Sequence, residues 1–355
     1  MKITFPYLGP VLAYRKMFEQ FGHEVIMPAP PTPKTIELGA KYSPEFICLP
    51  FKIILGSYLD AIQKGADLIV TSGGIGACRA GYFGALSEKI LKQLGYSIQV
   101  LVFDSIVNEF PAFYRQSQVI RNHKSIRETI SIVHLAVSLI FALDRYEKEI
   151  SQLRPYETIS GTCRQKWRDI QNILGGSNSI RELQANMVRA DRIIEEITVL
   201  PREDILKIGL LGEIYMVMNG PMNEEFEDKL ASLGAQVTRY RYISQWLKNA
   251  VRPNRSILKK ADRYLHYELG GHERENIGHM IQFKELGYDG IIHLLPFGCM
   301  PELVTQTVIP RITTDLDMPI LSLSLDEQTG WLNNQVRLEA FVDLLRNRKE
   351  LLKEG

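Results

Sequence analysis

The feature that most constrains the fold is an alternation of short apolar runs with amphipathic segments, and it occurs twice. In the first part of the chain, four runs are predicted strands: KITFPYLG, EVIMP, ADLIVTSG and SIQVLVFD. The segments between them predict helices near 10–21, 51–64 and 82–94. Strands that are apolar on both faces indicate a mostly parallel sheet covered by helices on both sides. Residues 1–105 are therefore predicted to form an N-terminal α/β domain.

The alternation resumes after LPRED. The predicted strands here are KIGLLGEIYMV, AQVTRY, GIIHLLPFG and PILSLSL. The predicted helices lie near 222–233, 255–266, 272–286, 301–314 and 335–352. We predict a C-terminal α/β domain over residues 206–355. No low-complexity tract and no short-period repeat is present in the sequence.

Between these two regions the strand signal fades. Long segments such as SIRELQANMVRADRIIEEIT have helical periodicity, and we predict a helical block over residues 106–205. The fold class expected for the 355 residues is α/β, with two Rossmann-like domains, parallel sheets and a helical insertion between them.

Charge and hydropathy exclude some classes of partner. The 42 basic residues nearly cancel the 41 acidic ones, so net charge gives no argument for nucleic acid or a membrane surface. The N-terminus lacks the apolar core of an export signal. The most apolar helical stretch, 131–143, is shorter than the ~20 residues of a membrane span, so we expect a buried helix. A cytoplasmic protein is expected, and its four cysteines do not suggest a secreted disulfide scaffold.

Three cysteines share one local context, a loop directly before a predicted helix. Cys48 lies in PEFICLPFK, Cys78 in TSGGIGACRAG and Cys299 in LLPFGCMPE, the last two directly after predicted strands. In an open α/β sheet such loops converge on a crevice, toward which the following helices point their partly positive N-termini. Free N–H groups there stabilise an anionic sulfur or an anionic iron-sulfur cluster. We expect the three loops to meet in the cleft between the domains.

Other interpretations of the cysteines stay open. Each one taken alone also fits a small buried hydrophobe. No compact C-x-x-C pair of a zinc ribbon or a ferredoxin-type cluster is present. Cys163, in ISGTCRQKW, has no strand before it, so a structural role is favoured over that of a fourth ligand.

The loop around Cys78 also has a nucleotide-binding interpretation. Gly74 and Gly76 occupy the first two positions of G-x-G-x-x-G, but Arg79 occupies the third, where close packing requires a small residue. Asp104 ends the next predicted strand, as an acidic partner for a ribose would. Tyr82 and Phe83 stand where a phosphate-binding P-loop has Lys and Ser or Thr. Neither type of phosphate site is convincing.

Charged residues near the three cysteines are candidates for catalysis or for tuning the thiolates. They lie within four positions of a cysteine and are Glu45, Lys52, Arg79 and Glu302. Each fits a solvated or helix-capping role equally well.

Several of these segments resemble a known family. The stretch DGIIHLLPFGCMPELVTQTVIPRI, followed by MPILSLSLDEQTG and RLEAFVDLL, is similar to the C-terminal block of proteins related to the 2-hydroxyacyl-CoA dehydratase D-component family. EFICLPFK and TSGGIGACRAGYFG resemble the matching N-terminal segments. The branch that this chain resembles most is described as acyl-CoA dehydratase activase-related. The helical block resembles the family only in general character.

The resemblance implies a 4Fe-4S cluster held between two Rossmann-like domains by Cys48, Cys78 and Cys299. Three protein ligands leave one iron open to an exogenous group, which in the dehydratases is the substrate. In the relatives called double-cubane cluster proteins, two cubanes share a bridging sulfide. The resemblance also implies an ATP-hydrolysing iron-sulfur activator as electron donor, an acyl-CoA or other small-molecule substrate, and a homodimer or a heterodimer with a related subunit.

Three functions follow as expectations. The first is a low-potential reductase component or a 2-hydroxyacyl-CoA dehydratase-like lyase of anaerobic metabolism. The second is a non-catalytic electron-transfer or cluster scaffold protein, favoured if Cys163 supplies a fourth ligand. The third is a metal-free nucleotide-binding α/β protein, based on the glycines at 73, 74 and 76 and on Asp104.

Overall fold

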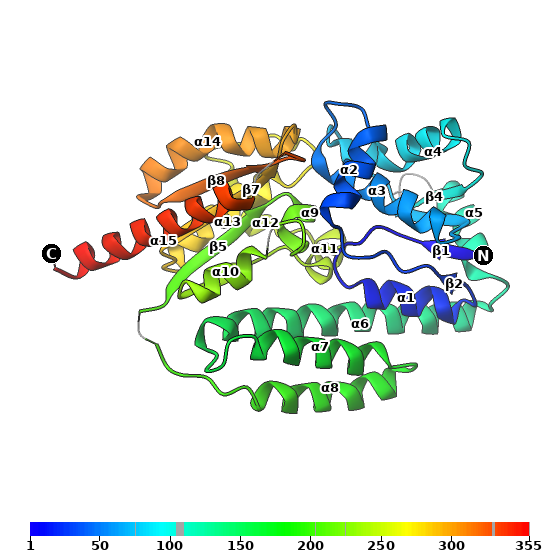
Figure 1. Cartoon of the computed structure of the whole chain (residues 1–355), viewed down its shortest axis with the longest axis horizontal. Helices are drawn as coiled ribbons and strands as arrows, with labels where there is room; N and C mark the ends of the chain where they lie inside the picture. The colour runs from blue at the N-terminus through cyan, green and yellow to red at the C-terminus, as the bar shows by residue number, and fades with distance from the viewer. Residues whose placement is uncertain (75, 104–109, 203, 224, 329–330, 355) are drawn as a thin grey trace.

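The computed structural model describes residues 1–74, 76–103, 110–202, 204–223, 225–328 and 331–354 (Figure 1). It is an α/β structure with two four-stranded sheets in which every described pair of strands is parallel. The first sheet has the order β2-β1-β3-β4 and the second the order β6-β5-β7-β8. Their strands are β1 (Lys2–Thr4), β2 (Glu24–Val25), β3 (Leu68–Ser72), β4 (Gln99–Phe103), β5 (Leu206–Gly212), β6 (Ala235–Arg239), β7 (Gly290–Pro296) and β8 (Ile320–Leu325).

The strand runs predicted from the apolar pattern contain seven of the eight described strands and all of β5 except Leu206, and the burial of the strands explains why the pattern was clear. Every residue of β7 is buried, as expected for a strand covered by helices on both faces. Prediction failed after β5, because the expected strand over 207–217 ends at Gly212. Gly212 has a φ of +136°, and the Glu213 side chain then caps a helix by accepting from the Met216 N–H at 3.0 Å. A left-handed glycine followed by a capping carboxylate ends the strand and starts the helix.

Helices cover the first sheet on both sides. They are α1 (Val11–Gln20), α2 (Pro33–Tyr42), α3 (Leu49–Gln63), the 3-10 helix η1 (Arg79–Tyr82) and α4 (Phe83–Gln93). The sequence analysis did not predict α2. Thr32 and Thr35 form a capping box at its start and Pro33 occupies its first turn, a combination typical of a helix N-terminus.

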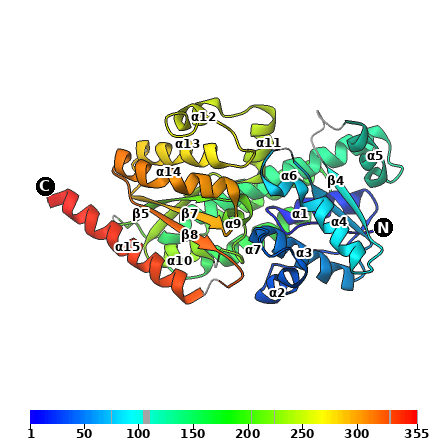
Figure 2. The ribbon, with the colours of Figure 1, turned by 90° about the horizontal axis from the view of Figure 1, so that it is seen from above.

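The second sheet carries α9 (Ile214–Met218), α10 (Phe226–Ser232), α11 (Ile243–Val251), α12 (Arg255–Ala261), α13 (Glu273–Glu285), α14 (Met300–Leu316) and α15 (Trp331–Glu354). The sequence analysis predicted all of these except α9 and α11. In Figure 2 the two halves lie side by side, and the C-terminal part of α15 extends away from the rest of the molecule.

Between β4 and β5 the described chain contains four α-helices and a short 3-10 helix. These are α5 (Phe110–Arg121), α6 (Ile126–Leu153), η2 (Arg154–Tyr156), α7 (Thr162–Gly175) and α8 (Ile180–Glu195). Figure 1 shows α6, α7 and α8 running along one side of both sheets. Because α6 packs against α1 as well as against β6 and α11, it contacts both halves of the molecule.

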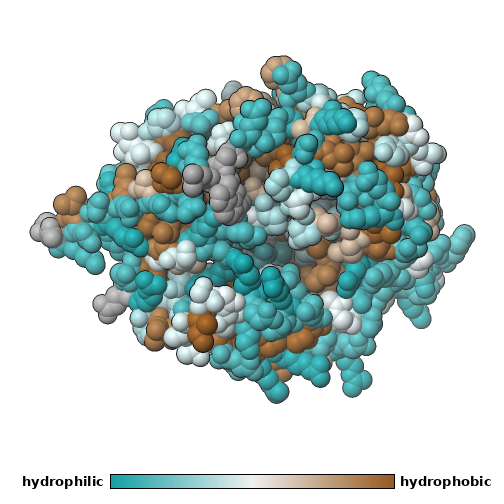
Figure 3. All heavy atoms as spheres, viewed as in Figure 1, coloured by the Kyte–Doolittle hydropathy of each residue, from teal (hydrophilic) through white to brown (hydrophobic). Residues whose placement is uncertain are grey.

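By length and composition alone, the segment Ile126–Tyr156 is long and apolar enough to cross a membrane. Its residues Leu139, Leu143 and Tyr146 are buried and belong to an apolar core shared with α1, α7 and α8. One face of this helix is therefore buried in the protein, whereas Ile130 and Val133 are exposed, so the prediction of a buried helix holds for that face alone. Figure 3 shows hydrophilic side chains over most of the visible face, with apolar ones in scattered patches.

A continuous apolar core joins the two sheets. It includes Phe51 and Leu55 of α3, Ile69 of β3, and Leu210 and Leu294 of the second sheet. A shared core of this kind fixes the relative position of the halves, and with it the position of the loops that lie between them.

Candidate functional site

Three cysteines each cap the start of a helix. Cys48 is the N-cap residue of α3, Cys78 that of η1, which leads directly into α4, and Cys299 that of α14. All three have extended backbone conformations, and none closes a side-chain capping hydrogen bond. An N-cap side chain lies beside the free N–H groups of the first helical turn. Cys48 and Cys299 thus lie at the starts of α-helices, and Cys78 at the start of the four-residue η1.

A cavity of about 660 Å³ lies between the two halves, and it contacts these helix starts. Cys78 and Cys299 line it, and Pro50, two positions after Cys48, lines it as well. The carboxyl ends of β3 and β5 contribute Gly73 and Glu213. The cavity thus occupies the crevice at the strand ends where ligands bind in open α/β sheets.

Burial dominates the protonation behaviour of the thiols, and nearby negative groups add to it. Burial raises the pKa of Cys48 to about 12, with smaller contributions from Glu213 and Cys78. Burial also raises the pKa of Cys299, to which Glu213, Glu302 and Cys48 add. Each of these two sulfurs is therefore close enough to another cysteine of the trio to interact with it electrostatically.

Burial raises the pKa of Cys78 as well, and the N–H group of Ala80 opposes part of this effect. Glu213, Glu273 and Glu302 add to the rise. The surrounding charges on the described residues are thus mainly negative, which disfavours bare thiolates.

The loops that carry the cysteines contact one another directly. The Ala77 N–H, next to Cys78, donates to the Leu269 carbonyl of the second half at 3.0 Å. Arg79 Nη1 donates to the Phe46 carbonyl, near Cys48, at 2.5 Å. A Cβ at Gly76 would lie 2.8 Å from the Gly270 Cα, so that crossing of the two loops requires glycine.

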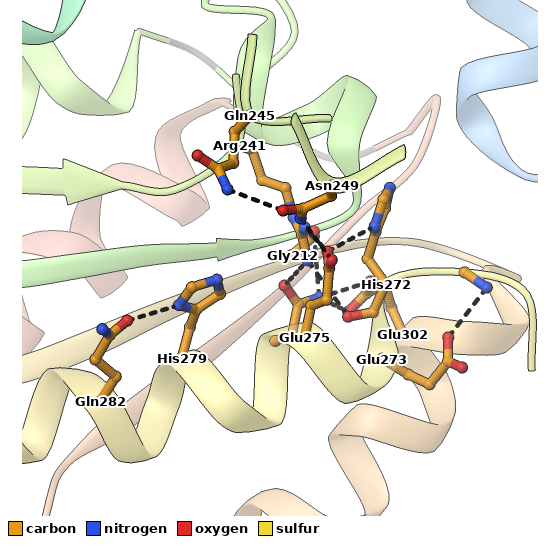
Figure 4. Close-up of polar contacts among 12 residues, drawn as sticks. Gly212, Arg241, Gln245, Asn249, His272, Glu273, Glu275, His279, Gln282 and Glu302 are labelled. Atoms are coloured by element: carbon orange, nitrogen blue, oxygen red, sulfur yellow. Dashed lines mark hydrogen bonds and ion pairs between the residues drawn. The ribbon is translucent and has the colours of Figure 1, made fainter. Parts of the chain in front are cut away.

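Glu302 lies beneath Cys299 in a buried hydrogen-bond network. Both of its carboxylate oxygens accept from Asn276 Nδ2 at 2.9 Å, and Oε2 also accepts from His293 Nε2 at 2.8 Å. His293 is completely buried and contacts Ser322 through Nδ1 at 3.0 Å. Figure 4 shows Glu302 among the polar side chains at the N-terminal end of α13. His293 is therefore a hydrogen-bonded core residue, and Glu302 lines the cavity as part of the same network.

Glu213 was not identified from the sequence. It follows β5 directly and lines the cavity. Burial raises its pKa to about 7, with Glu302 adding to the rise and the N–H groups of Tyr215 and Met216 opposing it. A carboxyl group with this pKa exchanges a proton near neutral pH, as a general acid or base does. The signal available in the sequence was Gly212-Glu213 at the end of an apolar run, which was misread as a continuing strand.

The remaining sequence candidates lie in different settings. Glu45 is exposed on the loop before Cys48. Lys52 is buried in α3, and its Nζ contacts Glu327 Oε1 at 2.5 Å. Cys163 is buried in α7, in the core shared with α6 and α8, and it does not line the cavity between the halves. Cys78 and Cys299 thus line the cavity, Cys48 lies two positions before Pro50 at its wall, and Cys163 lies in a separate core.

The donor set decides which group these cysteines can hold. Thiols with raised pKa values stay protonated at neutral pH, so they are poor free nucleophiles. A bound metal centre reverses this, because a coordinating thiol is deprotonated outright. Within the described parts of the chain, no three His, Cys, Asp or Glu side chains are close enough to share one metal ion. A multi-iron cluster requires a wider spacing, since each thiolate binds a different iron.

The nucleotide interpretation gains little from the geometry. Gly73 and Gly74 line the cavity beside Cys78, so their backbone is available to a ligand. Arg79 is exposed and is engaged with the Phe46 carbonyl. Asp104, the expected partner for a ribose, lies outside the described residues.

Comparison with known proteins leaves the chain without an assigned family. No model of a protein family matches it, and a search of curated proteins finds no significant match.

Proposed function

We propose that this protein holds an iron-sulfur cluster of the 4Fe-4S type in the cavity between its two halves, with Cys48, Cys78 and Cys299 as ligands. In the terms of the sequence resemblance, the halves are two Rossmann-like domains and the helices α5 to α8 are an insertion between them. The cluster would supply one-electron chemistry at low potential.

One observation carries this proposal: three cysteines from both halves cap three helix starts, of which Cys78 and Cys299 line one cavity and Cys48 lies two positions before Pro50, which also lines it. Their thiols have raised pKa values, for which metal ligation provides the compensating positive charge. The N–H groups of Phe51, Ala80 and Glu302 lie near the sulfurs and favour negative charge on them. Hydrogen bonds of this kind adjust the potential of a thiolate-bound cluster.

The favoured activity is that of a reductase component or a dehydratase-like lyase that receives electrons from an ATP-hydrolysing iron-sulfur activator. The cavity supports a catalytic role because it leaves room beside the cysteines for a small molecule. Glu213, with a pKa of about 7, is placed to give or take a proton there. Glu302 would hold the start of α14 in position through Asn276 and His293.

A second candidate is an electron-transfer or cluster scaffold protein without a reaction of its own. It requires four protein ligands. Cys163 lies in the core of α6, α7 and α8, which disfavours it as the fourth.

The test is purification under strict exclusion of oxygen, followed by iron and sulfide analysis and paramagnetic resonance of the reduced protein. We expect about four irons per chain. C48S, C78S and C299S should each lose most of the iron, whereas C163S, the matched control, should retain it. Colourless, iron-free protein isolated in this way would contradict the proposal.

A further inference from the structure

The two halves of the molecule repeat one arrangement. Both sheets have the same strand order, so β1 to β4 correspond in turn to β5 to β8. The last helix before the third strand is α3 in the first half and α13 in the second. The next helices after the third strand are η1 with α4, and α14. The correspondence therefore extends to the helices that surround the cavity.

The N-cap residues of these helices correspond as well. Cys78 caps η1 and Cys299 caps α14, so these two cysteines occupy equivalent positions in the two halves. Cys48 caps α3, and the residue that caps α13 is His272. The repeat thus places His272 at the position in the second half that Cys48 occupies in the first.

Close packing brings the loop of His272 to both cysteine loops. A Cβ at Gly271 would lie 2.5 Å from the side chain of Pro301, in the first turn of the helix that Cys299 caps. Gly270 crosses Gly76 in the loop of Cys78. His272 itself lines the cavity together with Cys78 and Cys299.

The ring of His272 is held through one nitrogen. Nδ1 contacts Glu275 Oε2 at 3.2 Å, and Glu275 in turn forms an ion pair with Arg241 and accepts from Asn249 at 2.9 Å. Figure 4 draws a contact at this nitrogen of the ring and none at Nε2. A histidine that binds a metal characteristically donates its other ring N–H to a carboxylate, which fixes the tautomer and the ring orientation. The contact with Glu275 leaves the Nε2 lone pair available.

We propose that His272 is the fourth protein ligand of the cluster, through Nε2, which completes a shell of three thiolates and one imidazole. This inference rests on the proposed function. A neutral imidazole adds no charge, so the cluster carries one negative charge fewer than with four thiolates, and its potential is higher. A complete protein shell moves the chain toward the electron-transfer candidate.

The test uses protein purified without oxygen and labelled with 15N-histidine, and measures hyperfine coupling in the reduced cluster by pulsed paramagnetic resonance. We expect a histidine nitrogen coupling in the wild type and in H266Q, a control at an exposed histidine. H272A should lose the coupling and fall to about three irons per chain. H272C should keep about four irons and show a lower midpoint potential, which separates loss of a ligand from loss of the fold.

Two failures are distinguishable. Iron-free wild type contradicts the proposed function. An iron-loaded wild type without histidine coupling, or an unchanged spectrum in H272A, overturns the ligand role of His272 and leaves the proposed function in place.

Discussion

Lys52 Nζ lies 2.5 Å from Glu327 Oε1, and this ion pair joins α3 of the first half to the loop after β8 of the second. The lysine side chain is 5% exposed and the glutamate side chain 32%. Removing the glutamate therefore leaves a buried charge without a partner, whereas removing the lysine leaves a charge that can reach water. The pair also lies one helical turn from Cys48, so it fixes that N-cap relative to the second half.

We expect E327Q to destabilise the protein more than K52M. E327Q leaves a buried ammonium without its charged partner, at a cost of about 3 kcal/mol. K52M leaves a carboxylate that can reach water and should cost about 1 kcal/mol or less. Urea unfolding of the two single variants and the double variant measures both costs and their coupling. Equal costs would show that the exposure of the two partners does not decide their roles.

E302A should destabilise the fold by about 2–4 kcal/mol, because Asn276 and His293 each lose a buried acceptor. E45A is the matched control, since Glu45 is exposed, and it should change stability by less than about 0.5 kcal/mol. Chemical denaturation measures both variants. A near-neutral E302A would mean that water replaces the carboxylate and that the network does not hold the start of α14.

G56A should destabilise by about 3 kcal/mol and lower iron binding. A Cβ at Gly56 would lie 2.0 Å from the Thr35 carbonyl, so α2 and α3 must separate, and α3 carries Cys48 at its start. In G175A the new methyl would lie 3.4 Å from Leu12, an ordinary contact. That control variant should be neutral or slightly more stable, since alanine favours the helix. Thermal unfolding and iron analysis of both variants test whether the close contact between α2 and α3 at Gly56 is required.

Acidification should destabilise the protein partly through His279. Burial, aided by Arg241, lowers the pKa of His279 to about 4. Its ring stacks on that of Tyr240, with the two ring centroids 4.3 Å apart. Between pH 6.5 and 4 the unfolded state takes up a proton that the folded state does not, so stability falls as the pH falls. The loss from this group reaches about 2–3 kcal/mol at pH 4.5.

H279Q should lack this component of the pH dependence, whereas H266Q, at an exposed histidine, should retain it. Urea unfolding at a series of pH values gives the slopes. If H279Q and the wild type have the same slope between pH 6.5 and 4.5, His279 is not the group that titrates. An NMR titration of the His279 ring gives the same answer without a substitution.

The sequence predicted the parts of the fold that depend on periodic burial. The run GIIHLLPFG became β7, whose seven residues are all buried. It missed α2, since Pro30, Thr32 and Pro33 look like a loop when the capping box is not recognised. It extended β5 into α9, because Ile214, Tyr215 and Val217 are apolar in either state. Periodicity does not distinguish a short buried helix from a strand.

For the site, the local pattern of Cys48, Cys78 and Cys299 identified three helix N-caps, of which Cys78 and Cys299 line the cavity. What the sequence did not reveal were the groups that depend on contacts between the halves. Lys52 and Glu327 are 275 positions apart, and no local pattern relates them. His272 was not among the sequence candidates, because its correspondence to Cys48 follows from strand order.

The cavity is walled by loops from both halves, and this has a consequence for biosynthesis. Cys48 and Cys78 leave the ribosome early, but Cys299 follows β7 and is made near the end of synthesis. At a synthesis rate of ~5–20 residues per second, the loop of Cys299 is made on the order of 10 s or more after the loops of Cys48 and Cys78. Whatever occupies the cavity must therefore be delivered to a nearly finished chain, and until then the two early thiols depend on the cell to keep them from oxidation.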